Sequence, residues 1–357
     1  MPAFANFYHG KTVLVTGHTG FKGGWLTAWL KSLGANLVGL ALPPESKPSF
    51  FDAVCLSCDM VSIFGDIREA SVVSSVFAKH RPEIVFHNAA QPLVLHSYRE
   101  PVETYATNVM GTVHVLEAVR QTPSVRAVVV VTSDKCYENR EWFWGYREED
   151  ALGGHDPYSS SKACAELVTA AYRQSFFSHE GTAAVATARA GNVIGGGDWS
   201  EDRLVPDIVR GIASNQPIII RRPNSVRPWQ HVLEPVRGYL LLAERLWDSR
   251  EYAEPWNFGP REQDAVPVAD VAQRLISAWG KGELRIQPDP DAPHEARYLR
   301  LNASKARTRL GWEPQLALEQ ALHGTSDWYR AYYDDAASAA AKTAEQIQRY
   351  SETAPHD

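Results

Sequence analysis

Tyr158 and Lys162 stand four residues apart in the segment DPYSSSKACAE, where Pro157 favours the start of a helix. At that spacing both side chains lie on one face of the helix, about one turn apart. An ammonium group beside a phenol favours the phenolate, so we expect the pKa of Tyr158 to fall below its usual value of about 10. The pair therefore predicts a general base for an alcohol, although most such pairs lie on protein surfaces without a function.

A second group of reactive side chains follows the apolar run VVVV at 128–131. Four β-branched residues without polar alternation predict a strand that is buried on both faces. Directly after it come two hydroxyls, an acid and an amine: Thr132, Ser133, Asp134 and Lys135. A hydroxyl here can share a hydrogen bond with the tyrosine base, but oxidation of an alcohol needs neither the acid nor the amine. The alternative for Asp134 is to cap the following turn.

A glycine-rich loop lies between the first predicted strand and the first predicted helix, in KTVLVTGHTGFKGGWL at 11–26. Gly17, Gly20 and Gly23 let backbone amides approach a pyrophosphate at the positive end of the helix. This context predicts dinucleotide binding rather than a simple tight turn. Lys22 is a candidate phosphate contact, with a solvated lysine at the helix start as the alternative.

The signature that normally separates NAD from NADP is missing. The second strand should end in an acid for the adenosine ribose or in an arginine for a 2′-phosphate, and GLALPPESKP at 39–48 offers neither in place. Asp66, in GDIRE, can accept the adenine amino group or cap a helix, and the two roles are compatible. Ala89 and Ala90, in HNAAQP, let the backbone lie against a cofactor, with simple packing as the alternative.

Composition excludes several classes of protein. The chain has 357 residues with 44% hydrophobic and 22% charged residues, which is typical of a globular protein and long enough for two lobes. A net charge of −6 argues against a general nucleic-acid binder, and no stretch approaches the roughly 18 apolar residues of a membrane span. The first residues resemble no secretory signal, so we expect a cytoplasmic protein. Cys55 and Cys58 lack partners for a zinc site, so we expect no metal and buried, reduced thiols.

The first half of the chain alternates short apolar runs with longer helical patterns. This rhythm predicts an α/β fold with a Rossmann-type, doubly wound parallel sheet. We expect strands at about 12–16, 37–42, 61–64, 84–88, 127–132 and 183–188. We expect crossover helices at about 22–33, 69–79, 101–121 and 157–178.

The pattern also predicts how the chain divides. Residues 1–190 would form the dinucleotide-binding domain. After GNVIGGGDW the rhythm changes to mixed helices, short strands and proline-punctuated loops, so 191–335 would form a smaller mixed α/β substrate-binding lobe. That lobe would be discontinuous, because part of 230–260 is expected to pack back onto the first domain. Residues 336–357 are polar and alanine-rich without an apolar stripe, which predicts a surface helix or a disordered tail.

Taken in order, TGHTGFKG, GDIRE, NAAQ, the Ser133 hydroxyl and YSSSK resemble the extended short-chain dehydrogenase/reductase family that acts on nucleotide sugars, over nearly the whole chain. The resemblance implies NAD as the cofactor and oxidation at C4 of the sugar by Tyr158, Lys162 and either Ser133 or Thr132. The implied cofactor contacts are Thr16, Gly17, Thr19, Gly20, Phe21, Lys22, Gly23, Asp66, Ile67, Ala89, Ala90, Gln91, Asn108, Thr132, Tyr158 and Lys162.

Asp134 and Lys135 distinguish a dehydratase from an epimerase. Epimerases of this family carry small residues after the hydroxyl, whereas dehydratases must also expel water, and hydroxide that leaves C6 needs a proton donor. The resemblance thus implies that Asp134 is the general acid. Dehydratases for thymidine-diphosphate glucose carry Glu where this chain has Lys135, so Lys135 is either the base at C5 or a stabiliser of the enolate.

The runs TSDKCYEN, GYREEDALGGHDPYSSSK and RPWQHVLEP resemble the branch of the family that dehydrates CDP-D-glucose, in deoxysugar and O-antigen biosynthesis. The alternatives are a dehydratase or epimerase for another nucleotide sugar and a non-catalytic dinucleotide-binding sensor, although a sensor needs no such catalytic set. The resemblance also implies a homodimer, or a tetramer, that pairs through the helices at 101–121 and 157–178. The implied substrate contacts are Asn192, Arg203, Leu204, Val205, Arg227, His294 and Arg297.

Overall fold

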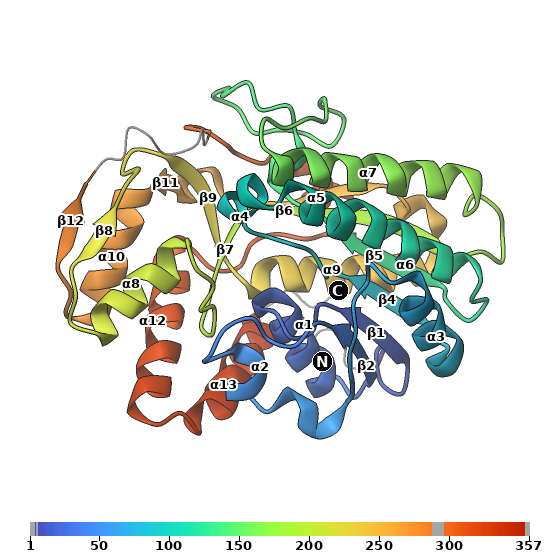
Figure 1. The fold of residues 1–357 in the computed structure, drawn as a ribbon, viewed down its shortest axis with the longest axis horizontal. Coiled ribbons are helices and arrows are strands. Elements are labelled where there is room, and N and C mark those ends of the chain that lie inside the picture. The colour runs from blue at the N-terminus through green and yellow to red at the C-terminus, as the bar shows by residue number, and fades with distance from the viewer. Residues whose placement is uncertain (1–3, 5, 288–295, 354–357) are drawn as a thin grey trace.

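A seven-stranded parallel sheet forms the larger lobe in the computed structural model, which describes residues 4, 6–287 and 296–353 (Figure 1). Its strands, in spatial order, are β10 (Pro255–Phe258), β6 (Ala184–Ala190), β5 (Ala127–Val131), β4 (Ile84–His87), β1 (Thr12–Thr16), β2 (Asn36–Ala41) and β3 (Val61–Phe64). All neighbouring pairs are parallel. The order reverses between β1 and β4, as in a doubly wound sheet, so the predicted fold class is confirmed.

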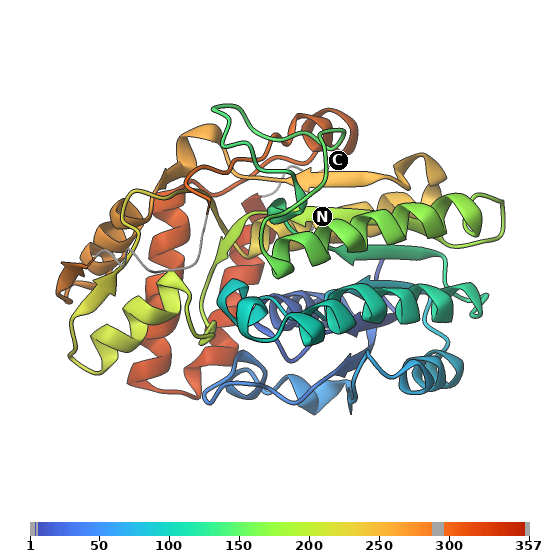
Figure 2. The same cartoon turned by 45° about the horizontal axis from the view of Figure 1, so that its top comes forward.

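Helices cover both faces of this sheet, and each face has its own hydrophobic core. On one face, Val13, Val15 and Val129 pack with α1 (Phe21–Ser32) and α9 (Leu233–Asp248). On the other face, alternate residues such as Leu14 and Val128 pack with α3 (Ala70–His80) and α6 (Gly111–Arg120). Figures 1 and 2 show α6 lying beside α7 (Pro157–Ser175). The valine run at 128–131 is therefore buried on both faces, as predicted.

The predicted helix at 101–121 is interrupted. It consists of α5 (Pro101–Tyr105), a π-helical turn at Ala106–Met110, and α6. Asn108 lies in the π-helical turn and is buried there. A π-helical turn inserts an extra residue that redirects a side chain, and the sequence periodicity carries no signal for it.

Two small sheets follow the seven-stranded sheet and belong to a smaller lobe. β7 (Asn192–Ile194), β9 (Val226–His231) and β11 (Ala265–Pro267) form one sheet, and β8 (Ile218–Ile220) pairs with β12 (Leu284–Ile286). We propose that the lobes divide at about residue 190, because β6 ends there, although α9 and β10 return to the large sheet. The remaining helices are α2 (Phe50–Ala53), α4 (Val94–Arg99), α8 (Leu204–Ala213), α10 (Val268–Trp279), α11 (Ser304–Leu310), α12 (Leu318–Asp334) and α13 (Ser338–Thr353). The short 3-10 helices are Leu56–Asp59, Asp134–Cys136, Arg250–Tyr252 and Glu262–Asp264.

The C-terminal helix corrects the prediction of a tail without an apolar stripe. Ala339, Thr343, Ile347 and Tyr350 of α13 are buried, at intervals of three or four residues, against α1 and α12. Two of these four residues, Ala339 and Thr343, are small and only weakly hydrophobic or polar, so the sequence pattern did not reveal the buried face of the helix. The Tyr350 hydroxyl donates to the buried carboxylate of Glu234, which also accepts the backbone N–H of Gln315 and Leu316.

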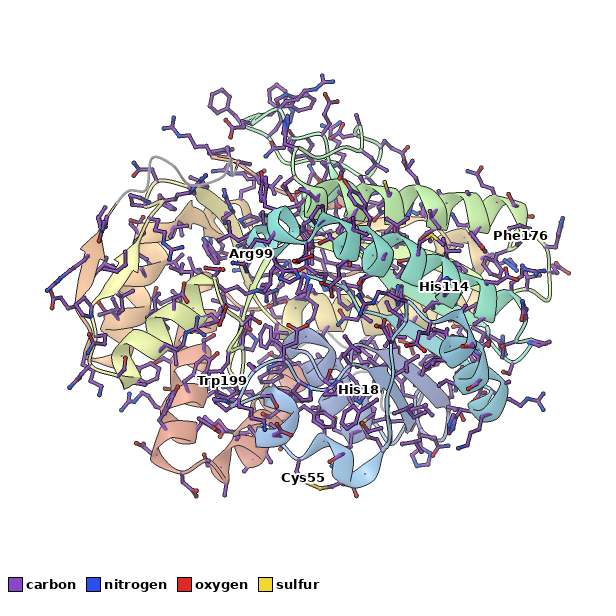
Figure 3. The ribbon with its side chains drawn as sticks, in the orientation of Figure 1. His18, Cys55, Arg99, His114, Phe176 and Trp199 are labelled. Atoms are coloured by element: carbon purple, nitrogen blue, oxygen red, sulfur yellow. A yellow bond between two sulfur atoms is a disulfide. The ribbon has the colours of Figure 1, made fainter. Side chains whose placement is uncertain are left out.

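The prediction of buried, reduced thiols at Cys55 and Cys58 is wrong. Both residues are exposed, and they form a disulfide across the turn at Leu56–Asp59. Residues three apart in a 3-10 turn face the same side, and the Cα–Cα distance of 5.8 Å lies within the range of disulfides. Figure 3 shows Cys55 at the periphery of the ribbon.

Within residues 4, 6–287 and 296–353, no three or more His, Cys, Asp or Glu side chains are grouped so that they could hold a metal ion. In the same part of the chain, none of the helices has the length and apolar character needed to span a bilayer.

Replacing Tyr350 by Phe should lower the free energy of unfolding by about 1–3 kcal/mol, because the buried Glu234 carboxylate loses a donor. Urea unfolding of the full chain measures this change. Tyr333→Phe on α12 is the matched control, because Tyr333 is 43% exposed and should change stability by less than about 0.5 kcal/mol. Equal effects of the two substitutions would contradict the anchoring role of Tyr350.

Candidate active site

A cavity of about 1070 Å³ opens where the carboxyl ends of β1, β4 and β5 face the smaller lobe. In open parallel sheets, ligands bind at this edge, beside the point where the strand order reverses. The predicted residues that line it are Gly17, Thr19, Gly20, Phe21, Lys22, Asp66, Ile67, Ala89, Ala90, Thr132, Ser133, Asp134, Lys135, Tyr158, Lys162, Asn192, Arg203, Leu204, Val205 and Arg227. The tertiary structure thus brings together side chains that lie up to about two hundred residues apart in the sequence.

The glycine loop is packed so closely that side chains would not fit. Gly17 has a φ of +76°, and a Cβ there would lie 2.8 Å from the backbone of Ala89. A Cβ on Gly23 would lie 2.0 Å from the carbonyl oxygen of Gly17. Gly20 is the N-cap residue of α1 and has no side chain that could cap the helix. The first N–H groups of α1 are therefore not capped by a side chain. This cradle suits a pyrophosphate.

Thr16, Gly23, Gln91 and Asn108 were predicted to bind cofactor, but they do not line the cavity. Thr16 Oγ1 instead accepts the backbone N–H of Ala89 at 3.1 Å, which holds the alanine segment against the glycine loop. The side-chain oxygen Oδ1 of Asn108 accepts the Gln91 backbone N–H at 2.8 Å, and the side-chain Nδ2 donates back to the Gln91 backbone carbonyl at 3.0 Å. These residues support the wall of the site from behind.

Asp66 borders the cavity but does not cap a helix, because α3 has Glu69 at its N-cap position, without a side-chain cap. The Asp66 carboxylate accepts the Arg68 N–H at 2.8 Å and pairs with the Arg68 guanidinium at 2.6 Å. Burial raises the pKa of Asp66, but hydrogen bonds and charge from Arg68 outweigh that effect and leave it lowered. An ionised acceptor at this position is compatible with an adenine amino group.

Tyr158 is placed by the start of α7. The Asp156 side chain caps this helix by accepting the Ser159 N–H at 2.8 Å, and Pro157 occupies its first position. The Tyr158 N–H, which has no partner within the helix, donates to Ser97 Oγ at 3.1 Å. The tyrosine ring therefore enters the cavity from a fixed first turn.

The pKa of Tyr158 departs from the prediction. Burial raises it to about 12, whereas a hydrogen bond with Ser133 acts in the opposite direction. The Lys162 amine donates to the Val131 carbonyl at 3.3 Å, and burial lowers the pKa of Lys162 to about 8. The sequence showed the helical spacing of the pair but not the loss of water around both side chains, which disfavours each charged form.

Ser133, rather than Thr132, is the hydroxyl that meets Tyr158. The Thr132 hydroxyl donates to the buried carboxylate of Glu166, away from the tyrosine. Ser133 Oγ donates to Asp134 Oδ1 at 3.0 Å and accepts the Lys135 N–H at 3.2 Å. The structure thus separates two hydroxyls that the sequence left as alternatives.

Asp134 is suited to donate a proton. Burial raises its pKa, against the opposing charges of Lys135, Arg227 and Lys22. Its Oδ2 atom is buried and has no hydrogen-bond partner among the described residues. Lys135, the next residue, lines the same cavity and is half-buried.

Positive charge gathers in this cavity although the chain has a net charge of −6. Lys22, Lys162, Arg203 and Arg227 all line it. Burial first, and then the charges of Arg203 and Lys162, lower the pKa of Lys22 to about 7. Such a concentration of cations suits an anionic ligand such as a diphosphate.

The smaller lobe supplies most of the predicted substrate contacts. Arg227 on β9 is only 3% exposed, and its guanidinium donates to the Val226 carbonyl at 2.9 Å. Arg203 begins α8 and pairs with Asp198 at 3.1 Å. The Arg297 side chain is exposed and does not line the cavity, contrary to its predicted contact, and His294 lies outside the described residues.

Sequence reasoning missed several cationic side chains at the cavity. Arg99, the last residue of α4, lines it and is labelled in Figure 3. Arg221 and Arg222, after β8, line it from the smaller lobe. The position of α4 after the fourth strand was the available signal, because loops at carboxyl ends of parallel strands form such sites.

Comparison with known proteins gives consistent results. A family model described as GDP-mannose 4,6 dehydratase matches residues 14–325. The chain is 52% identical to a CDP-glucose 4,6-dehydratase of Salmonella typhimurium, over 92% of each chain, and 29% identical to a dTDP-glucose 4,6-dehydratase of Xanthomonas campestris, over 89% and 93%. A crystal structure of dTDP-glucose 4,6-dehydratase from Bacillus anthracis in complex with NAD shares the fold, with a TM-score of 0.76, 22% identity, and coverage of 91% and 98%.

Replacing Gly23 by Ala should lower the free energy of unfolding by about 1–3 kcal/mol, because the new Cβ would overlap the Gly17 carbonyl. Thermal or urea unfolding without ligand measures this effect. Gly20→Ala is the control, because its Cβ would lie 3.5 Å from the same oxygen, an ordinary contact, and should cost less than about 1 kcal/mol. A Gly23 variant as stable as the control would show that the loop relaxes freely.

Proposed function

The chain belongs to the GDP-mannose 4,6-dehydratase family, part of the extended short-chain dehydrogenases/reductases, and on that premise we propose that it is an NAD-dependent hydro-lyase that converts CDP-D-glucose to CDP-4-keto-6-deoxy-D-glucose. The observation that carries this proposal is Asp134, a buried acid with a raised pKa and an unpartnered oxygen, beside Ser133 and Tyr158. Oxidation at C4 requires no proton donor of this kind, whereas the loss of water does.

The residues around the glycine loop fit a dinucleotide. Gly17 and Gly20 leave room for a pyrophosphate at the start of α1, and the Ala89 and Ala90 backbone offers a flat neighbouring wall. Asp66 lies where it can accept the adenine amino group. Bound there, NAD⁺ would take hydride from C4 of the sugar and return it to C6.

Tyr158 acts as the base in the oxidation at C4. It removes the proton of the sugar 4-hydroxyl, and Ser133 shares this hydrogen bond. Burial holds the tyrosine proton, so the hydrogen bond with Ser133 and the nearby positive charge of Arg203 are needed to favour the phenolate. Lys162, one turn further along α7, adds positive charge to the same cavity.

Asp134 and Lys135 carry out the loss of water. A ketone at C4 acidifies the hydrogen at C5, and Asp134 protonates the hydroxide that leaves C6. The raised pKa of Asp134 keeps a larger fraction protonated for this step. We assign Lys135 to the C5 proton, because it follows Asp134 at the cavity, and stabilisation of the enolate is the second role that this position allows.

Arginines of the smaller lobe hold the substrate diphosphate. Arg227 is buried and its guanidinium is oriented by the Val226 carbonyl, so little conformational freedom is lost when it binds phosphate. Arg203 approaches from the start of α8, whose next residues, Leu204 and Val205, also line the cavity. Asn192, after the end of β6, adds an amide donor.

We further propose that two copies pair through α5–α6 and α7 and that the protein works in the cytoplasm. These helices carry exposed apolar side chains, including Val102 at 81% and Leu167 at 58% exposure. Burial of such side chains between two copies would stabilise a symmetric dimer.

Incubation with NAD and a set of nucleotide sugars tests the function. Cytosine presents an amino donor where uracil and thymine present a carbonyl, and an unmatched buried polar group costs about 1–3 kcal/mol. We therefore expect kcat/KM for CDP-D-glucose to exceed the values for UDP- and dTDP-glucose by at least about tenfold. Mass spectrometry follows the loss of one water. Equal use of the other sugars would refute the cytidine preference, and no loss of water from any of them would refute the dehydratase.

Asp134→Asn should slow the loss of water more than oxidation at C4. The amide keeps the shape of the side chain but cannot deliver a proton to the leaving hydroxide, a loss of about 10²–10⁴-fold. Stopped-flow mixing should therefore show NADH absorbance that builds up before product forms. Tyr158→Phe is the comparison, because it should prevent the NADH signal altogether. If Asp134→Asn slows both phases equally, Asp134 only organises the site.

A further inference from the structure

A buried acid, Glu166, lies one helical turn beyond Lys162 on α7, so Tyr158, Lys162 and Glu166 follow one another at four-residue intervals. Glu166 is 3% exposed. One of its oxygens accepts the Thr132 hydroxyl, and the other accepts Thr187 Oγ1 at 2.6 Å and the Arg189 guanidinium at 2.8 Å. Its carboxylate thus joins α7 to the ends of both β5 and β6.

Glu166 is ionised in this position. Burial raises its pKa, but the Arg189 charge and the hydrogen bonds from Arg189, Thr132 and Thr187 outweigh burial and leave it lowered. Arg189 is itself buried and also donates to the Tyr137 hydroxyl at 2.8 Å and to the Glu148 carbonyl at 3.0 Å. The negative charge of Glu166 is therefore held inside the protein by Arg189 and is not exposed to solvent.

This charge acts on Lys162. Lys162 interacts electrostatically with Glu166 on α7, Cys136 after β5, Lys22 on α1 and His87 on β4, and Tyr158, whose pKa is raised by burial, lies one turn earlier on α7. Burial raises the pKa of Cys136 and lowers that of His87 to about 3, so both are neutral near pH 7. Of these groups, only Glu166 carries a negative charge near pH 7 and opposes the loss of the Lys162 proton.

The same carboxylate orders the end of β5. The Thr132 N–H donates to the Ala188 carbonyl at 2.9 Å while its hydroxyl is held by Glu166. Successive side chains of an extended segment point to opposite sides, so a Thr132 that faces Glu166 places Ser133 toward Tyr158. Holding one hydroxyl behind the site thus orients the other within it.

We propose that Glu166 is a positioning residue of the reaction, which holds Thr132 behind the strand end and keeps the Lys162 ammonium charged within the cavity. The role of Glu166 in catalysis rests on the proposed function. Its electrostatic effect on Lys162 is independent of the proposed function, because both side chains belong to the protein without substrate.

The test is the titration of Lys162 in Glu166→Gln. Pulse labelling with acetic anhydride across a range of pH, followed by peptide mass spectrometry, reports the neutral fraction of this amine separately from Lys22. The wild-type midpoint should lie near pH 8. The glutamine keeps the shape and one accepting oxygen of the side chain but removes the charge, so the midpoint should fall by about one unit. Where the dehydration can be assayed, the alkaline limb of kcat should move in the same direction, because the ammonium is lost at lower pH.

Thr187→Val is the matched control, because it removes one hydrogen bond to Glu166 and leaves its charge in place. Its midpoint should stay within about 0.3 units of wild type, less than the shift expected from removing the charge. If Glu166→Gln does not fold with Arg189 unpaired, the double variant Glu166→Gln, Arg189→Met removes both charges and should still lower the midpoint.

The labelling separates this inference from the proposed function. An unchanged Lys162 midpoint in a folded Glu166 variant, or an equal fall in Thr187→Val, would overturn the role of Glu166. A wild-type protein that dehydrates no nucleotide sugar would overturn the proposed function and leave the labelling result readable.

Discussion

Loss of water around charged groups at the carboxyl end of β5 is the constraint on which the chemistry of this protein depends. Burial raises the pKa of Asp134 and of Tyr158 and lowers that of Lys162. For Asp134 the shift favours a proton donor. For Tyr158 it opposes a base, so the site needs positive charge and the Ser133 hydrogen bond to offset it. The paired charges of Glu166 and Arg189 lie directly behind this region, and the Arg189 guanidinium donates to the Glu166 carboxylate, so neither buried charge is left without an opposite one.

The reversal of strand order between β1 and β4 decides where that chemistry takes place. It opens one edge of the sheet, and the smaller lobe closes over this edge with Arg203 and Arg227. The chain as a whole is acidic, but the cavity gathers cations from both lobes. A diphosphate between the lobes would neutralise this charge and connect the glycine loop with the substrate contacts.

The family fold is compatible with several reactions, and a few side chains at one strand end select among them. Ser133, Tyr158 and Lys162 line the cavity together, and in the proposed mechanism they serve the oxidation at C4. Asp134 stands at the start of the short 3-10 turn that follows Ser133, and one of its buried oxygens has no hydrogen-bond partner among the described residues. The change from epimerase to dehydratase chemistry thus requires new side chains on an existing turn rather than a new scaffold.

Local sequence patterns determined the six predicted strands, the helices that connect them, the glycine loop and the spacing of Tyr158 and Lys162, because these depend on near neighbours. The stripe of α13, the disulfide of Cys55, the outward position of Arg297 and the choice of Ser133 over Thr132 were decided by tertiary structure. So was the direction of the pKa shift of Tyr158, which the sequence predicted wrongly. Periodicity shows which residues share a face of one helix or strand. It does not show which distant segment removes their water, and burial by distant segments fixes both hydrogen-bond partners and charge.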